Sequence, residues 1–360
     1  MTHMQNRVQR LRDLIAQKGM EAAVLYSREN TRYFAGFTGT ESTTLITRDQ
    51  CFILVDSRYT SQAGKQCPGY TVVDSTLKGL TALSEVLQEH KVGVAGVEDE
   101  AVPLSIYRKY ETNSPDVRFL PLESSLSGLR SQKDADEIWR IEQAVRIADE
   151  AFESILPLIR PGVTELGIAF ELETAMRRLG AEKPSFDTIV ASGARGALPH
   201  GVASEKEIQA GDGIVFDFGC IYRGYCSDIT RTVFVGAPDP ELRHVYEVVL
   251  AAQEAAEKML GPGVTGSEAD EAARQVIAKA GYGDLFGHGL GHGVGLAIHE
   301  SPRLSRTNPG RLLPGDVVTV EPGIYLPGKG GVRIEDIAVI EEAGARILTG
   351  SPKQLRILPV

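Results

Sequence analysis

The sequence predicts a mixed α/β (α+β) protein of two domains, the second of which is built from two similar halves. Short apolar segments alternate with helical patterns at the start of the chain. Further along, a helix start followed by an acidic strand occurs twice in the same order. The length of 360 residues suits two domains, since one domain typically has roughly 100–200 residues.

The front of the chain has the pattern of a small α/β domain. Residues 9–18 have helical periodicity, and the apolar segments 22–26, 51–56 and 92–97 are flanked by turn residues, which is typical of strands. The small and polar segment SSLSG at 124–128 predicts a linker. We therefore place the two domains at residues 1–126 and 127–360.

The rest of the chain repeats itself. A long amphipathic helix is expected over residues 134–156, and the sequence PGVT begins one helix at 161–164 and another at 262–265. The segment GDGIVFD, which ends at Asp217, resembles GDVVTVE, which ends at Glu321. We expect Asp228 and Glu335 to lie in the second strand of each half. Two halves related by a pseudo-twofold axis would then each direct two carboxylates into one cleft.

Four carboxylates and one imidazole are the candidate metal ligands. Carboxylate oxygens and an imidazole suit a pair of divalent ions better than a structural zinc. Buried carboxylates are costly unless they are paired or bind a metal. Taken alone, each could instead be a salt-bridged strand end. The five residues are Asp217, Asp228, His292, Glu321 and Glu335.

The segment 287–300, GHGLGHGVGLAIHE, holds three histidines and five glycines. Glycines allow the backbone to approach a ligand closely, and they destabilise a regular helix. The segment therefore has the composition of a binding loop. Its spacing alone does not decide whether His288, His292 or His299 is the metal ligand.

Together these motifs resemble the pita-bread metallopeptidases, and in particular the branch that holds prolidase and X-prolyl aminopeptidase (aminopeptidase P). The matching segments are DFG…YCSDITRT at 217–232, GHGLGHGVGLAIHESP at 287–302 and EPGIY…GVRIED at 321–336. NTRYFAGF at 30–37 and DSRY at 56–59 resemble the creatinase-like N-terminal domain of that branch. The resemblance implies a creatinase-like domain followed by a pseudo-twofold pita-bread domain.

The resemblance also implies two divalent ions per chain, which would be Mn, Co or Zn. Asp217 would bind one ion, Asp228 and Glu335 would bridge the pair, and His292 and Glu321 would complete the other site. His292 is assigned because the family's ligand precedes the histidine of the His-Glu pair by seven residues.

Three residues receive catalytic roles from the resemblance. Glu321 would take a proton from the attacking water and pass it to the leaving nitrogen. His299 would donate to the scissile carbonyl oxygen, and His200 would lie near the scissile nitrogen. Without the resemblance, the alternative for His200 is a histidine of a surface loop.

Three further residues are assigned to the substrate pocket. His288 would line it, and Arg333 would orient Glu335 or Asp217 while contributing to the pocket. Arg303 lies where prolidases bind the carboxylate of a dipeptide, but it could equally be structural.

The implied reaction is hydrolysis of the bond between an N-terminal residue and a following proline, in dipeptides or in longer peptides. The alternatives are a methionyl-aminopeptidase-like enzyme of broad specificity, a metal-independent creatinase-type hydrolase, and a non-enzymatic binding domain. The front domain counts against the first, and the complete ligand set counts against the other two.

Composition limits the partners. The net charge of −10 argues against nucleic acid and anionic membranes, and no apolar run reaches the ~20 residues of a membrane span. Four cysteines without zinc spacing predict reduced thiols and a cytoplasmic protein. A small peptide is the expected substrate, and the resemblance implies a homodimer.

Overall fold

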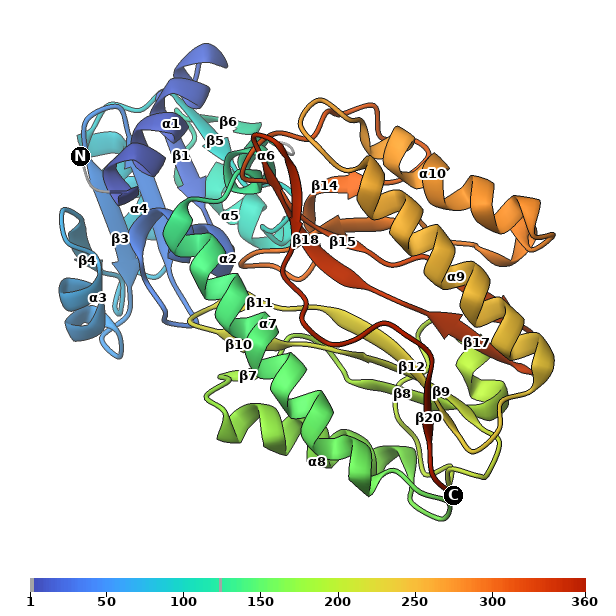
Figure 1. Cartoon of the computed structure of the whole chain (residues 1–360). Coiled ribbons are helices and arrows are strands. Elements are labelled where there is room, and N and C mark those ends of the chain that lie inside the picture. The colour runs from blue at the N-terminus through green and yellow to red at the C-terminus, as the bar shows by residue number, and fades with distance from the viewer. Residues whose placement is uncertain (1–2, 123–124) are drawn as a thin grey trace. The chain divides into compact units, whose positions relative to one another are not determined.

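The computed structural model describes residues 3–122 and 125–360, which form two compact units (Figure 1). The division falls after Arg130, at the end of helix α6 (Ser125–Ser131). The linker expected at 124–128 is therefore wrong for residues 125–128, and Ser124 lies outside the described residues. Leu126 and Arg130, one helical turn apart, are both buried, and Arg130 donates to Asn30. These contacts stabilise a helix where composition alone indicated a loop.

The first unit is a six-stranded mixed sheet in the order β4-β3-β2-β1-β5-β6. In β3, Phe52 and Leu54 belong to one apolar cluster while Ile53 and Val55 belong to another. Because side chains alternate along a strand, these two clusters cover opposite faces of the sheet. The predicted helix and strands are all present. The elements are α1 (His3–Gln17), β1 (Ala22–Leu25), α2 (Arg28–Ala35), β2 (Thr43–Thr47), β3 (Cys51–Val55), α3 (Thr60–Gln66), β4 (Thr71–Asp74), α4 (Thr81–Glu89), β5 (Val94–Val97), α5 (Leu104–Asn113) and β6 (Arg118–Pro121).

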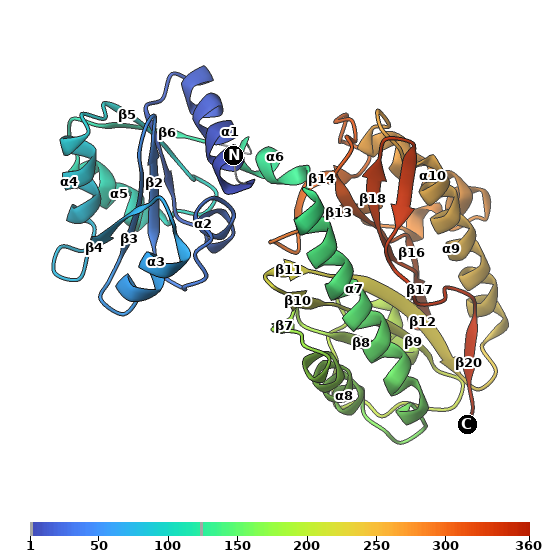
Figure 2. The same cartoon turned by 60° about the vertical axis from the view of Figure 1, so that its left-hand side comes forward.

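The second unit contains two similar halves, as predicted. Each half has a helix pair followed by an antiparallel strand pair (Figures 1 and 2). The first half has α7 (Ala135–Ile155), α8 (Glu165–Arg178), β9 (Gly213–Phe218) and β12 (Ile229–Val235), and the second has α9 (Pro240–Met259), α10 (Gly266–Lys279), β15 (Val317–Val320) and β18 (Asp336–Glu341). Thr164 caps α8 and Thr265 caps α10, so both PGVT segments begin a helix. The two halves of the pseudo-twofold fold therefore share the threonine cap of a helix as well as the order of their elements.

The elements of the first half are α7 (Ala135–Ile155), η1 (Leu156–Leu158), α8 (Glu165–Arg178), β7 (Lys183–Pro184), β8 (Ile189–Ser192), η2 (Gly193–Ala197), β9 (Gly213–Phe218), β10 (Cys220–Tyr222), β11 (Tyr225–Cys226) and β12 (Ile229–Val235). Those of the second half are α9 (Pro240–Met259), α10 (Gly266–Lys279), η3 (Gly283–Leu285), β13 (Gly291–Gly293), β14 (Glu300–Leu304), β15 (Val317–Val320), β16 (Gly323–Leu326), β17 (Gly330–Arg333), β18 (Asp336–Glu341), β19 (Gly344–Ile347) and β20 (Arg356–Leu358).

Apolar packing fixes each helix pair on its sheet. Phe152 of α7 stacks on Phe218 of β9, with ring centroids 5.1 Å apart. The core of the other half joins residues of α9 and α10, such as Val249 and Ala273, to Val320 of β15. No helix in the described residues is both long enough and apolar enough to cross a membrane.

Candidate metal centre and active-site pocket

The ten site residues predicted from the sequence line a single cavity of about 830 Å³ in the second unit. The chain brings them together from segments that lie more than one hundred residues apart. They are His200, Asp217, Asp228, His288, His292, His299, Arg303, Glu321, Arg333 and Glu335. Their individual roles remain predictions, whereas their common location is a structural finding.

The two antiparallel strand pairs place the four carboxylates. Asp217 lies in β9 opposite Thr230 of β12, and Glu321 follows directly after β15. Asp228 and Glu335 were expected within strands, but each stands one residue before its strand begins. At these two points the chain lies outside the strand ladder, and the carboxylates line the cavity instead.

His292 lies among these carboxylates. Its Nε2 is 3.3 Å from Glu321 Oε1 and 3.5 Å from Asp228 Oδ2. Its Nδ1 is 3.1 Å from the carbonyl oxygen of Gly293. A carbonyl can only accept, so Nδ1 carries a hydrogen and Nε2 is the atom that would bind a metal ion, which is the usual arrangement of a ligating histidine. Asp228, His292 and Glu335 each offer a ligand atom within 4.8 Å of the others.

Two carboxylate oxygens of the cluster are buried without a hydrogen-bond partner among the described residues, Asp217 Oδ1 and Glu335 Oε1. Burial raises the pKa of Asp217. Burial, and then the neighbouring carboxylates, raise the pKa values of Asp228 and Glu335 well above their usual range. So much negative charge in a buried site requires compensation, and divalent cations supply it. The donor set therefore fits a metal centre.

Glu321 differs from the other carboxylates. Burial raises its pKa, but the hydrogen bond and charge of the adjacent His292 outweigh this effect and lower the pKa to about 2. Its Oε1 also accepts a hydrogen bond of 3.1 Å from Thr319 Oγ1. Glu321 is thus ionised at neutral pH in the metal-free site.

Arg333 organises one side of the cavity. Its Nη2 donates to Asp217 Oδ2 at 2.5 Å, its Nη1 donates to Tyr325 OH at 2.9 Å, and its Nε donates to Thr230 Oγ1 at 3.0 Å. Of the two partners expected for Arg333, the structure therefore shows direct contact with Asp217. Glu335 is reached through Thr230, which donates to Glu335 Oε2 at 2.7 Å.

Sequence reasoning assigned no role to Thr230 or Tyr325, although both lie in the quoted motifs. Tyr325 OH accepts from Arg333 and lies 2.8 Å from His288 Nε2, while His288 Nδ1 lies 2.9 Å from the Gly289 carbonyl. The carbonyl requires a hydrogen on Nδ1, so Nε2 accepts from the tyrosine. His288 is therefore held in one tautomer as part of the cavity wall.

The remaining candidates lie at different depths. The ring of His299 packs edge-on against His292, with centroids 4.3 Å apart. Burial, then the neighbouring His292 and Arg303, lower the pKa of His299, which is neutral at pH 7 as a result. His200 and Arg303 are exposed at the rim of the cavity.

The fold and the site together define a metallopeptidase. Residues 140–342 match the sequence model of metallopeptidase family M24, and residues 7–132 match that of the creatinase/prolidase N-terminal domain. The chain belongs to metallopeptidase family M24, in its prolidase branch with a pita-bread catalytic domain.

Relatives of known name resemble the whole chain. The solved Xaa-Pro dipeptidase from Bacillus anthracis is 44% identical, with a TM-score of 0.96 over 99% of this chain and 100% of that one. The X-Pro aminopeptidase from Thermotoga maritima is 42% identical, with a TM-score of 0.91 over 98% and 99%. The Xaa-Pro dipeptidase from Pyrococcus furiosus is 38% identical over 353 residues, which are 98% of this chain and 100% of that protein. These relatives do not favour the methionyl-aminopeptidase or creatinase-type alternatives.

Proposed function

We propose that this protein is a dinuclear-metal exopeptidase that hydrolyses the bond between an N-terminal residue and a following proline. The observation that carries the proposal is the buried cluster of four carboxylates and His292, with two orphaned oxygens, in a cavity large enough for a small peptide. The relatives supply the X-Pro specificity, because three of them are named for that bond.

The five ligands would hold two divalent ions in this cluster. Such ions lower the pKa of a water molecule and polarise a carbonyl. The oxygen-rich donor set favours Mn²⁺ over Co²⁺ or Zn²⁺. The test is elemental analysis of the purified protein, followed by return of each metal to stripped enzyme. We expect about two ions per chain and the highest activity with Mn²⁺.

The side chains around the cluster would handle protons and developing charge. Glu321, which is ionised, would accept the proton of the attacking water and return it to the leaving nitrogen. Neutral His299 would donate its ring hydrogen to the scissile carbonyl oxygen as negative charge develops there. His200, at the rim, would contact the substrate near the scissile nitrogen.

We propose dipeptides as the preferred substrates because of Arg303. Its guanidinium is exposed at the cavity rim and has no hydrogen bond or ion pair with any residue in the described ranges 3–122 and 125–360. A free guanidinium suits the C-terminal carboxylate of a dipeptide, which it can bind through two parallel hydrogen bonds.

The experiment compares Ala-Pro with its C-terminal amide in wild type, Arg303→Ala and Arg303→Lys. A hydrogen bond to a charged group contributes about 1.5–3 kcal/mol, so Arg303→Ala should lower kcat/KM for Ala-Pro by about 10- to 100-fold. The amide should be cleaved equally by wild type and variant. The kcat/KM of Arg303→Lys for Ala-Pro should be intermediate, because lysine keeps the positive charge but cannot form the two parallel hydrogen bonds of a guanidinium.

A different result would favour an enzyme that cleaves longer peptides. If wild type cleaves X-Pro tripeptides faster than dipeptides and Arg303→Ala affects both alike, the enzyme is an aminopeptidase that acts on longer peptides. Two other expectations remain proposals: a homodimer, testable by sedimentation, and a cytoplasmic location. The four unpaired cysteines support the location.

A further inference from the structure

We propose that Thr230 is a positioning residue, whose hydroxyl fixes the carboxylate of Glu335 so that one defined oxygen is available to a metal ion. The inference rests on the proposed metal centre. It concerns a residue of strand β12 that is itself no predicted metal ligand and is not among the residues that line the cavity.

The direction of the Thr230 hydroxyl is determined by its two neighbours. Thr230 is fully buried, and its Oγ1 lies 3.0 Å from Arg333 Nε and 2.7 Å from Glu335 Oε2. A guanidinium can only donate, so it occupies a lone pair of the hydroxyl. The single hydroxyl hydrogen must therefore point at Glu335 Oε2.

This fixed direction distinguishes the two oxygens of Glu335. Oε2 is held by Thr230, whereas Oε1 is buried without a partner in the described part of the chain. The same guanidinium donates to Asp217 Oδ2. Asp217 Oδ1 is likewise buried without a partner in the described part of the chain. Arg333, directly and through Thr230, thus leaves one free oxygen on a carboxylate from each half.

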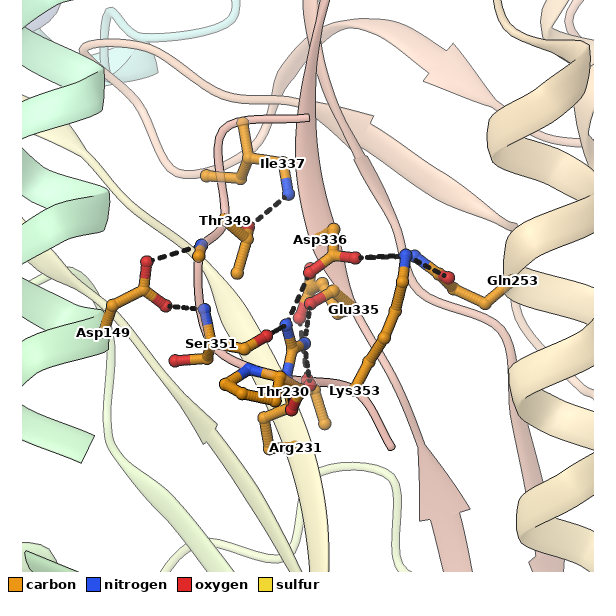
Figure 3. A network of polar contacts seen from close by, with 12 residues as sticks. Asp149, Thr230, Arg231, Gln253, Glu335, Asp336, Ile337, Thr349, Ser351 and Lys353 are labelled. Atoms are coloured by element: carbon orange, nitrogen blue, oxygen red, sulfur yellow. Dashed lines mark hydrogen bonds and ion pairs between the residues drawn. The ribbon is translucent and has the colours of Figure 1, made fainter. Parts of the chain in front are cut away.

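The backbone of Glu335 is held by other contacts (Figure 3). Its N–H donates to the Thr230 carbonyl at 3.1 Å, and its carbonyl accepts from Arg231 Nη1 at 2.5 Å. Arg231 also donates to Asp336 Oδ1 at 2.7 Å, and Asp336 Oδ2 accepts from Lys353 at 2.9 Å. Removal of the Thr230 hydroxyl should therefore release the carboxylate of Glu335 and leave its main chain in place.

Thr232 provides a matched control two residues along the same strand. It is equally buried, but its hydroxyl bonds to the main chain of Arg333, donating to the carbonyl at 2.9 Å and accepting from the N–H at 3.2 Å. Thr→Val at either position removes one buried hydroxyl with little change of volume. Only the change at Thr230 removes a contact with a proposed ligand.

The experiment measures Mn²⁺ binding to metal-stripped full-length protein by titration calorimetry, with the melting temperature of each metal-free variant as a second readout. Loss of a contact that orients a ligand typically weakens metal affinity by about 10- to 100-fold. We expect that loss for at least one Mn²⁺ in Thr230→Val, and also in Thr230→Ala should the valine variant not fold. Thr230→Ser should recover an affinity within about threefold of wild type.

We expect Thr232→Val to bind Mn²⁺ as wild type does, even though its metal-free melting temperature falls about as much as that of Thr230→Val. Equal Mn²⁺ affinities in Thr230→Val and wild type would overturn the inference, as would equal losses in the two valine variants. If stripped wild type itself binds no Mn²⁺, the proposed metal centre fails and the inference fails with it.

Discussion

Among single residues, Glu321 combines two features that a catalytic carboxylate requires. It lies 3.3 Å from His292 Nε2 within the cluster of predicted ligands, and its pKa of about 2 means that it is ionised at neutral pH. Glu321→Gln keeps the shape of the side chain and removes the charge. Because general acid–base catalysis contributes about 10²–10⁴-fold, kcat should fall by at least 10²-fold.

The measurement is kcat on Ala-Pro at saturating Mn²⁺, with the metal content of each sample determined in parallel. Glu341→Gln is the control, since Glu341 ends strand β18 and its carboxylate pairs with the exposed Arg346. The control should retain full activity. A Glu321→Gln enzyme with more than about a tenth of the wild-type kcat would exclude the role assigned to Glu321.

The sequence motifs indicated which residues line the cavity, but they could not indicate the hydrogen bonds among them. Asp217, His292 and the other candidates occur in specific motifs, and all of them line one cavity. Thr230 also lies in a motif, yet its donor Arg333 is 103 residues further along the chain. The direction of a hydroxyl depends on which groups the folded chain brings beside it, and no local pattern contains that information.

Among the elements, α8 and α10 each anchor a loop of the pocket, one in each half of the second unit. Asp270 of α10 is fully buried, accepts from the Leu290 N–H at 2.9 Å and pairs with Arg274 at 2.5 Å. Arg274 Nη1 in turn donates to the Phe286 carbonyl at 2.8 Å. The pair therefore holds the loop that carries His288.

In α8 the anchoring residue stands at a different position of the helix, at Glu165, which directly follows the cap Thr164 and is also fully buried. Its Oε1 accepts from the Ser192 N–H at 2.7 Å and its Oε2 from the Ser204 N–H at 3.1 Å. These serines lie on either side of the segment that carries His200. In both halves, an acidic residue near the start of the helix thus anchors a loop with a pocket histidine.

We expect Asp270→Ala to destabilise the protein by about 3–5 kcal/mol, because Arg274 would remain buried without its partner. The control is Glu150→Gln, which breaks the exposed pair between Arg146 and Glu150 and should cost less than about 0.5 kcal/mol. Urea unfolding of the metal-free proteins gives both values. Losses of similar size in the two variants would show that the Asp270 pair does not hold the fold.

Predictions of whole elements were reliable where a periodic pattern was long. The pattern over 134–156 corresponds to α7 (Ala135–Ile155), with Asp134 as its cap. The linker signal was less reliable, because residues 125–128 form part of α6. Helix formation there depends on burial of Leu126 and Arg130, which is a tertiary effect.

At the scale of the whole molecule, the predicted metal ligands are divided between the two halves of the second unit. The first half supplies Asp217 and Asp228, and the second supplies His292, Glu321 and Glu335. Neither half contains all five predicted ligands, so the proposed centre would be complete only when both halves are folded. Bound cations should therefore stabilise residues 131–360 as a unit, by an amount that grows with the logarithm of the free metal concentration.

This division predicts where metal should protect the chain from hydrogen exchange. At a free Mn²⁺ concentration one hundred times the dissociation constant, the stabilisation is about 2.7 kcal/mol, which slows exchange through global opening of the second unit about 100-fold. Amides of β9, β12, β15 and β18 should show this effect between metal-stripped and Mn²⁺-loaded protein.

Strands β1, β3 and β5 lie in the first unit, which supplies none of the five predicted ligands, and their exchange should not change. The first unit thus serves as an internal control within the same sample. Equal slowing in both units would mean that the cations act on the entire chain, and slowing confined to β9 and β12 would mean that the second half contributes no ligand.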